Sequence, residues 1–177
     1  MLEIRSASAA DAADIARIYA PYVTKAPASF ELDPPAAEDM AARIETSLAK
    51  HAWLVASENG VIVGYAYGTT ARTRAAYRFT VEVSVYLDGD ARGRGIGKAL
   101  MIELLETLAT RGYLTAIAGV TLPNDASVRL FESLGFESVG VYRNIGYKFG
   151  RWHDVGWWQR SLVSAYPDAP PEVPLDA

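Results

Sequence analysis

Hydrophobic residues along most of the chain either alternate with polar ones or recur every three to four positions, and the two periods predict different elements. Helical spacing predicts four helices, which begin after Ser8, at Asp33-Pro34, after Gly97 and at Asn124. Alternation and short β-branched runs predict strands over residues 2–4, 53–57, 61–67, 79–87, 115–121, 137–142 and 155–161. The order β-α-α-β-β-β-α-β-α-β-β predicts an α/β fold with a mixed sheet flanked by helices in one domain.

Prolines and glycines mark the boundaries of these elements. Pro21 is expected to disturb the first helix, and Glu58-Asn59-Gly60 predicts a hairpin turn. Asn124 is expected to cap the last helix, which ends at Gly135. Residues 166–177 contain four prolines and are expected to form a loose tail, so the predicted domain spans residues 1–165.

Composition narrows the range of functions. The 177 residues are half hydrophobic and 21% charged, which favours one packed soluble domain. Cysteine is absent and the two histidines, His51 and His153, lie far apart, so we expect no metal site. A net charge of −4 argues against general binding of nucleic acid, and no apolar stretch is long enough to suggest a membrane span. A cytoplasmic enzyme or binding domain for small molecules is the expectation.

A glycine-rich, basic segment separates a predicted strand from a predicted helix: Arg92, Gly93, Arg94, Gly95, Ile96, Gly97 and Lys98. Glycines allow a tight turn that directs several N–H groups at one anion, and the helix N-terminus adds its dipole. This predicts a cradle for a pyrophosphate, with a plain glycine-rich connection as the alternative. A P-loop is excluded because Ala99, and not Ser or Thr, follows Lys98. A dinucleotide fingerprint would need an acidic residue at the end of the next strand, which instead runs into Pro123.

These seven residues resemble the acetyl-CoA pyrophosphate loop of the GNAT acetyltransferase superfamily. A second motif at the expected spacing, residues 124–127 followed by 130–136, resembles the other half of that signature. Residues 3–163 further resemble the phosphinothricin and methionine sulfoximine N-acetyltransferases, through 80–86, 122–125 and 146–156. The resemblance implies a single-domain GNAT fold with a mostly antiparallel, splayed sheet, acetyl-CoA as co-substrate and a homodimer. The acceptor it implies is a small amine that carries a carboxylate.

The resemblance also implies where the cofactor binds. The implied cofactor residues are Val85, Tyr86, Leu87, the loop 92–98, Asn124, Ser127 and Phe131. Backbone N–H groups of Val85–Leu87 would polarise the thioester carbonyl. Many family members carry tyrosine or histidine where this chain has Phe131, and phenylalanine has no proton to donate. The general acid is therefore unassigned.

Glu82 is the predicted general base, because an amine must lose a proton before it attacks. It is a carboxylate in an otherwise apolar strand and resembles the family's glutamate at this position. The alternatives are a glutamate on the solvent face of the strand, or His153 as the base, although a structural role fits His153 better.

Acceptor contacts are predicted for Phe30, Arg72, Arg74, Tyr77, Glu82, Val83 and Ser84. An arginine grips a carboxylate with a planar fork, and Arg72 is preferred to Arg74 for this role. The alternative for the arginines is an exposed basic loop, and for Phe30 a hydrophobic anchor.

Two further functions stay open at this stage. One keeps the chemistry with another acceptor, such as a peptide N-terminus, a polyamine or an aminoglycoside. The other is a non-catalytic acyl-CoA sensor, favoured by Phe131 and disfavoured by Glu82.

Overall fold

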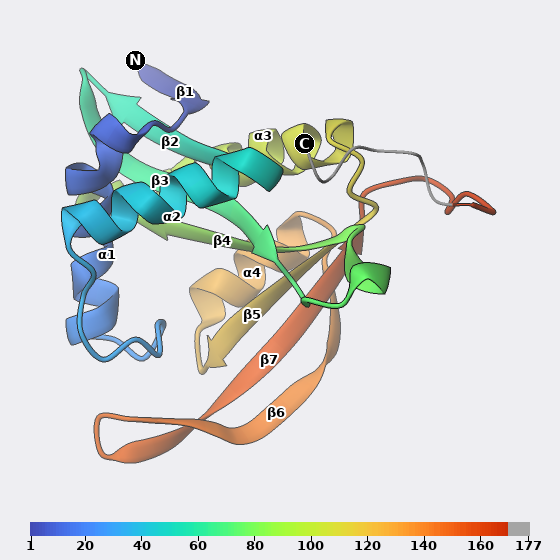
Figure 1. Ribbon diagram of the computed structural model, residues 1–177. Helices are drawn as coiled ribbons and strands as arrows, with labels where there is room; N and C mark the ends of the chain where they lie inside the picture. Colours follow the sequence, from blue (N-terminus) through green and yellow to red (C-terminus); the bar gives the residue numbers. More distant parts are fainter. Residues whose placement is uncertain (170–177) are drawn as a thin grey trace.

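The computed structural model describes residues 1–169 and shows a twisted sheet with helices on both faces (Figure 1). The strands are β1 (Leu2–Ser6), β2 (Trp53–Glu58), β3 (Val61–Thr70), β4 (Thr80–Leu87), β5 (Thr115–Leu122), β6 (Glu137–Lys148) and β7 (Arg151–Ser161). The helices are α1 (Ala12–Thr24), α2 (Ala37–Lys50), α3 (Ile96–Thr110) and α4 (Asp125–Ser133). The predicted order of helices and strands is confirmed.

The seven strands form one sheet in the order β1-β2-β3-β4-β5-β7-β6. All neighbours are antiparallel except β4 and β5, which are parallel. The predicted mixed, mostly antiparallel sheet is confirmed. The parallel pair stands at the centre, and its crossover is α3.

Two hydrophobic cores lie on opposite faces of the sheet because side chains alternate along each strand. Trp53 and Val55 of β2 pack with α1 and α2, whereas Leu54 and Ala56 pack with α3 on the other face. The same alternation sends Val81 and Val83 of β4 toward α3. Glu82, between them, therefore faces the side of the sheet that carries α1 and α2.

The hairpin of β6 and β7 is longer than the sequence pattern predicts. We expected strands over 137–142 and 155–161, but the ladder continues through pairs such as Tyr147 with Trp152 and Lys148 with Arg151. Phe149 and Gly150 both have positive φ, 52° and 74°, as a two-residue type I′ turn requires. Residues 143–154 contain glycines and charged residues, which are not typical of a strand. The register shift between Tyr142 and Gly146 also interrupts the alternation of polar and apolar positions.

Other boundaries differ for local reasons. The first helix continues past Pro21 to Thr24. The second begins at Ala37 rather than at Asp33-Pro34, because Pro34 itself precedes a proline and is kept out of the helical region. The Asn59-Gly60 turn is confirmed by two positive φ angles. The predicted tail lies partly outside the described residues, and the Tyr166 hydroxyl at its start is 2.7 Å from the Thr115 hydroxyl.

Candidate active site

The site forms where β4 leaves β5. The two strands pair only from Thr80–Glu82 to Thr115–Ile117, whereas β3 stays paired with β4 as far as Leu87. The second half of β4 consequently has one free edge. This is the predicted splay, and it opens a cleft in the centre of the sheet.

The free edge presents a backbone donor to the cleft. The N–H of Asp88 donates to Val63 on β3, so the N–H of Leu87 points to the opposite edge, since neighbouring residues of a strand alternate. By the same alternation the N–H of Val85 faces the cleft, whereas the N–H of Val83 faces β5 beside the Glu82–Ile117 pair, where the two strands are still joined. Leu87 differs from Val85 because its N–H and its C=O are both taken by the Tyr22 hydroxyl. Val85 therefore offers the donor that Leu87 does not.

A narrow cavity of about 70 Å³ follows this edge. Its walls contain these predicted residues: Val83, Ser84, Val85, Tyr86, Asn124, Ser127 and Phe131. Gly119 and Thr121 of β5, with Tyr22 and Ala28, complete it. A slot with a free strand N–H in one wall fits an extended chain with amide groups, such as the pantetheine arm of acetyl-CoA.

Asn124 has the predicted capping role. Its side-chain oxygen accepts a hydrogen bond from the backbone N–H of Ser127 at 3.2 Å, which fixes the first turn of α4. Phe131 lies on the same helix, 4% exposed, with its ring centroid 5.2 Å from that of Phe136. Phe131 thus belongs to the core and to the cleft wall together.

The loop from Arg92 to Lys98 has the conformation expected of an anion cradle. Gly93 and Gly95 have φ of 71° and 81°, and a Cβ on either would meet no atom within 4 Å. Backbone conformation, and not space, therefore requires glycine at both positions. The first N–H groups of α3 are left for an anion.

The residues of this loop differ in their exposure and in their contacts. Ile96 and Gly97 are buried, so only their backbone is available to a ligand. Lys98 is exposed, and the Arg92 guanidinium lies 4.9 Å from the Tyr22 ring centroid. Arg94 is paired with Glu58 at 2.7 Å, so its predicted contact with a pyrophosphate requires that ion pair to open.

Glu82 is half-buried at the last residue pair before the strands diverge. Burial raises the pKa of its carboxyl, and the positive charge of Arg72 opposes the rise. A carboxylate in this environment holds a proton more readily than an exposed one does, which suits a general base for an amine.

Arg72 differs from the other basic residues of its segment. Its guanidinium carbon lies 5.7 Å from the ring centroid of Trp157, which in turn lies over Gly119. Arg74 and Tyr77 are exposed and line a separate hollow of about 240 Å³ together with Arg72. The structure therefore brings Arg72 near Glu82 and leaves Arg74 and Tyr77 farther along the loop.

Phe30 and His153 lie in the contact between the α1–α2 loop and the β6–β7 hairpin. The Phe30 ring covers Gly146 so closely that a Cβ there would lie 2.4 Å from it, and its centroid is 6.1 Å from that of His153. His153 is 3% exposed, with its Nε2 2.9 Å from the Lys148 carbonyl. The Lys148 ammonium donates to the carbonyl oxygens of Ser29 and Glu31. Phe30 and His153 thus serve to hold the α1–α2 loop against the β6–β7 hairpin.

Tyr22 is a site residue that the sequence pattern did not single out. Its partner Leu87 lies 65 residues away, and no local pattern marks a contact of that kind. Among residues 1–169 there is no group of three or more His, Asp or Glu side chains placed to hold a metal ion. None of the helices in that range is long and apolar enough to cross a membrane.

Comparison with known proteins identifies the family. Residues 4–157 match the model of the acetyltransferase (GNAT) domain. The phosphinothricin N-acetyltransferase of Streptomyces viridochromogenes is 38% identical over 169 residues, 96% of this chain and 92% of the relative. The L-methionine sulfoximine/L-methionine sulfone acetyltransferase of Salmonella typhimurium is 40% identical over 117 residues, 66% of this chain and 68% of the relative.

Solved structures agree with the sequence comparison. A GNAT superfamily phosphinothricin acetyltransferase from Sinorhizobium meliloti, in complex with acetyl-CoA, superposes with a TM-score of 0.92 at 39% identity. The match covers 97% of this chain and 94% of that one. The chain therefore belongs to the GNAT acetyltransferase family, as an acetyl-CoA-dependent N-acetyltransferase.

Proposed function

We propose that this enzyme acetylates the α-amino group of a small amino-acid-like acceptor of the phosphinothricin, methionine sulfoximine or methionine sulfone type. One observation carries the proposal: a half-buried carboxylate, Glu82, lies where the sheet opens, within reach of the positive charge of Arg72. An acceptor with an amine and a carboxylate matches that pair of groups. The relatives named for such acceptors support the assignment.

Glu82 acts as the general base in this mechanism. The acceptor binds with its carboxylate toward Arg72 and its ammonium toward Glu82, which removes a proton directly or through a water. The neutral amine then attacks the thioester carbonyl, which acetyl-CoA supplies as an activated acetyl group. A C–N bond forms, the C–S bond breaks, and the nitrogen loses its second proton to water, which in turn supplies one to the thiolate.

The N–H of Val85 is assigned to the developing oxyanion, because it points into the cleft from the free edge of β4. The leaving thiolate then takes a proton. Phe131 has none, the Tyr22 hydroxyl is held by Leu87, and burial raises the pKa of Tyr86 well above its usual value. A tyrosine with a raised pKa is a poor acid, so we assign this protonation to water.

Peptide, polyamine and aminoglycoside acceptors fit the site less well. Arg72 places a positive charge beside Glu82, and a polycationic acceptor would meet that like charge there. A sensor without turnover would have no use for a carboxylate whose burial raises its pKa.

The test is release of CoA from acetyl-CoA across a panel of acceptors: phosphinothricin, methionine sulfoximine, methionine sulfone, spermidine, kanamycin and a short peptide. Wild type is compared with Glu82→Gln, with the exposed Glu103→Gln as the control. We expect turnover on the amino-acid analogues that falls by about 10²–10⁴-fold only in Glu82→Gln. Binding of acetyl-CoA with no turnover on any acceptor would instead establish the sensor.

We further propose a cytoplasmic homodimer in which the β6–β7 hairpin contacts a second copy. Large apolar side chains are exposed along it: Val139, Val141, Tyr142, Ile145, Tyr147 and Trp152. Several exposed large apolar side chains on one hairpin are typical of protein interfaces. Sedimentation of Trp152→Glu beside Val61→Glu, a charge on an exposed valine of β3, tests this. A dimeric Trp152→Glu protein would place the interface elsewhere.

A further inference from the structure

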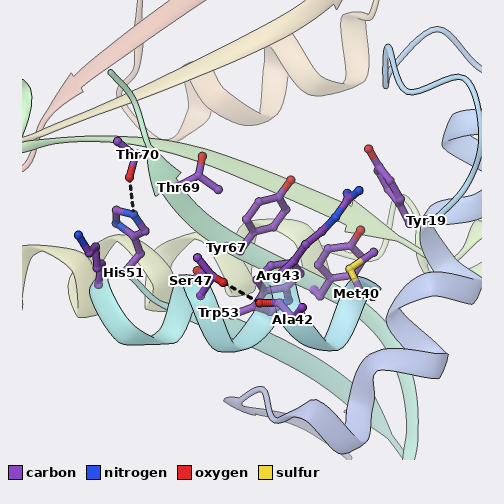
Figure 2. Close-up of a pocket in the computed structure, with 13 residues that line it drawn as sticks. Tyr19, Met40, Ala42, Arg43, Ser47, His51, Trp53, Tyr67, Thr69 and Thr70 are labelled. Atoms are coloured by element: carbon purple, nitrogen blue, oxygen red, sulfur yellow. Dashed lines mark hydrogen bonds between the residues drawn. The ribbon is translucent and has the colours of Figure 1, made fainter. Parts of the chain in front are cut away.

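A second and larger cavity, of about 540 Å³, lies between α2 and the β2–β3 part of the sheet (Figure 2). Its aromatic wall consists of Trp53, Tyr65 and Tyr67, and α2 contributes Arg43, Ser47 and His51. This volume is within the usual range of pockets for small molecules. The mechanism above makes no use of it.

The cavity adjoins the proposed base. Tyr67 and Thr69, which both line it, are the partners of Ser84 and Glu82 in the β3–β4 ladder. Partners in an antiparallel ladder project from the same face, with Cβ atoms about 5 Å apart. A ligand held at Glu82 therefore has the cavity directly beside it, across one strand.

Arg72 lies on the opposite side of Glu82. It contacts Trp157 on β7, beyond β5, whereas the cavity lies over β3 and β2. The amine, carboxylate and side chain of an amino acid leave its α-carbon in three directions. With the amine at Glu82 and the carboxylate toward Arg72, the side chain is directed toward the cavity.

Flat aromatic surface forms one wall of the cavity. The Trp53 and Tyr67 rings stack with centroids 4.2 Å apart, and Tyr65 is 5.7 Å from Trp53. Burial raises the pKa of Tyr65 and of Tyr67, so both hydroxyls stay protonated and can donate at neutral pH. The wall thus combines apolar faces with hydrogen-bond donors.

Two side chains of α2 on this wall, Arg43 and Ser47, already have protein partners. Arg43 makes two hydrogen bonds to Glu31, at 2.7 and 2.9 Å, and Ser47 donates to the Gly68 carbonyl. Burial lowers the pKa of His51 to about 4, which leaves the ring neutral. The Arg43–Glu31 pair also fixes the rim of the cavity, so the pocket is formed before a ligand binds.

We propose that this cavity binds the side chain of the acceptor amino acid, and that Tyr67 selects side chains with an apolar stem and terminal oxygen acceptors. The inference rests on the proposed function, because it needs an amino acid held at Glu82. Sulfone, sulfoximine and phosphinate groups have such oxygens. A cationic side chain would meet Arg43 and Lys50 on the lining and is excluded.

The test compares two acceptors of similar length, L-methionine sulfone and L-norleucine, which differ in the terminal oxygens. Tyr67→Phe removes one donor and keeps the ring, so we expect the kcat/KM ratio of sulfone to norleucine to fall about fivefold. Thr46→Trp adds bulk on the lining and should raise KM for both acceptors roughly tenfold. Ala49→Trp, on an exposed position of α2 outside the lining, is the matched control. The KM for acetyl-CoA is measured in each protein.

The outcomes separate the two proposals. If wild type turns over neither analogue of methionine nor phosphinothricin, the proposed function fails. If wild type is active but Tyr67→Phe keeps the ratio and Thr46→Trp keeps both KM values, the acceptor side chain lies elsewhere and this inference is overturned. Equal losses in Thr46→Trp and Ala49→Trp would overturn it as well, since bulk anywhere on α2 would then suffice.

Discussion

The Tyr22 hydroxyl lies 2.7 Å from the carbonyl oxygen of Leu87 and 3.1 Å from the amide nitrogen of the same residue. It donates to the carbonyl and accepts from the N–H. One side chain of α1 thereby satisfies both backbone groups at the end of β4, where no strand pairs with that edge. The relationship fixes the end of β4 to α1 at the outer end of the cleft.

Tyr22→Phe should destabilise the fold by about 1–3 kcal/mol, because it leaves a donor and an acceptor of Leu87 without a partner. We also expect a several-fold higher KM for acetyl-CoA. Thermal unfolding and initial rates measure the two effects. Tyr166→Phe, which removes an exposed hydroxyl contact with Thr115, is the control and should change neither. An unaltered melting temperature for Tyr22→Phe would refute this account of Leu87.

The raised pKa of the Glu82 carboxyl favours activity and opposes stability at neutral pH. Its folded-state pKa is raised, so the acidic limb of kcat/KM should lie at a higher pH than for an ordinary glutamate. The folded state holds this proton more tightly than the unfolded state. Stability from the group is complete below the unfolded pKa and is lost as pH rises through the folded pKa. Glu82→Gln should therefore lose activity by about 10²–10⁴-fold yet be at least as stable as wild type at pH 7. A melting temperature that falls would show that the ionised carboxylate stabilises the fold.

Gly95 should not tolerate a side chain, although space is free around it. Its φ of 81° is strained for alanine, so Gly95→Ala should cost about 1–2 kcal/mol or reshape the loop. We expect weaker binding of acetyl-CoA by calorimetry. Gly89→Ala has equal space and no positive φ, and its affinity should match wild type. Equal affinities in the two variants would mean that the loop conformation does not matter for binding.

Asp11 should stabilise the fold above the pKa of an unfolded aspartate. Its side chain accepts two hydrogen bonds from Arg5, at 2.8 and 2.7 Å, and another from the Ser8 N–H. The Arg5 hydrogen bond is the main cause that lowers the pKa of this carboxyl.

That stability is lost as pH falls through the lowered folded-state pKa of Asp11. Asp11→Asn should cost about 1 kcal/mol at pH 7, a modest value because Arg5 is partly exposed to solvent. The difference from wild type should shrink in strong acid. A penalty that does not change with pH would assign the effect to packing.

Sequence alone determined the features that depend on local order. The Gly93–Gly97 turn, the Asn124 cap and the Asn59-Gly60 hairpin were each predicted and confirmed, because backbone conformation at such positions depends on the residue itself. Alternation along β4 likewise separated Glu82 from its apolar neighbours. The order of helices and strands followed from the two hydrophobic periods.

Tertiary structure decided what depends on pairing between distant segments. Three features of the site depend on residues dozens of positions apart. They are the separation of β4 from β5, the hydrogen bonds between Tyr22 and Leu87, and the cavity beside α2. The sequence favoured Arg72 over Arg74 as the partner of the acceptor carboxylate, but only the structure places the Arg72 guanidinium beside Trp157. Local periodicity carries no information about such contacts, since they arise when sheet register and helix packing bring separate segments to one face.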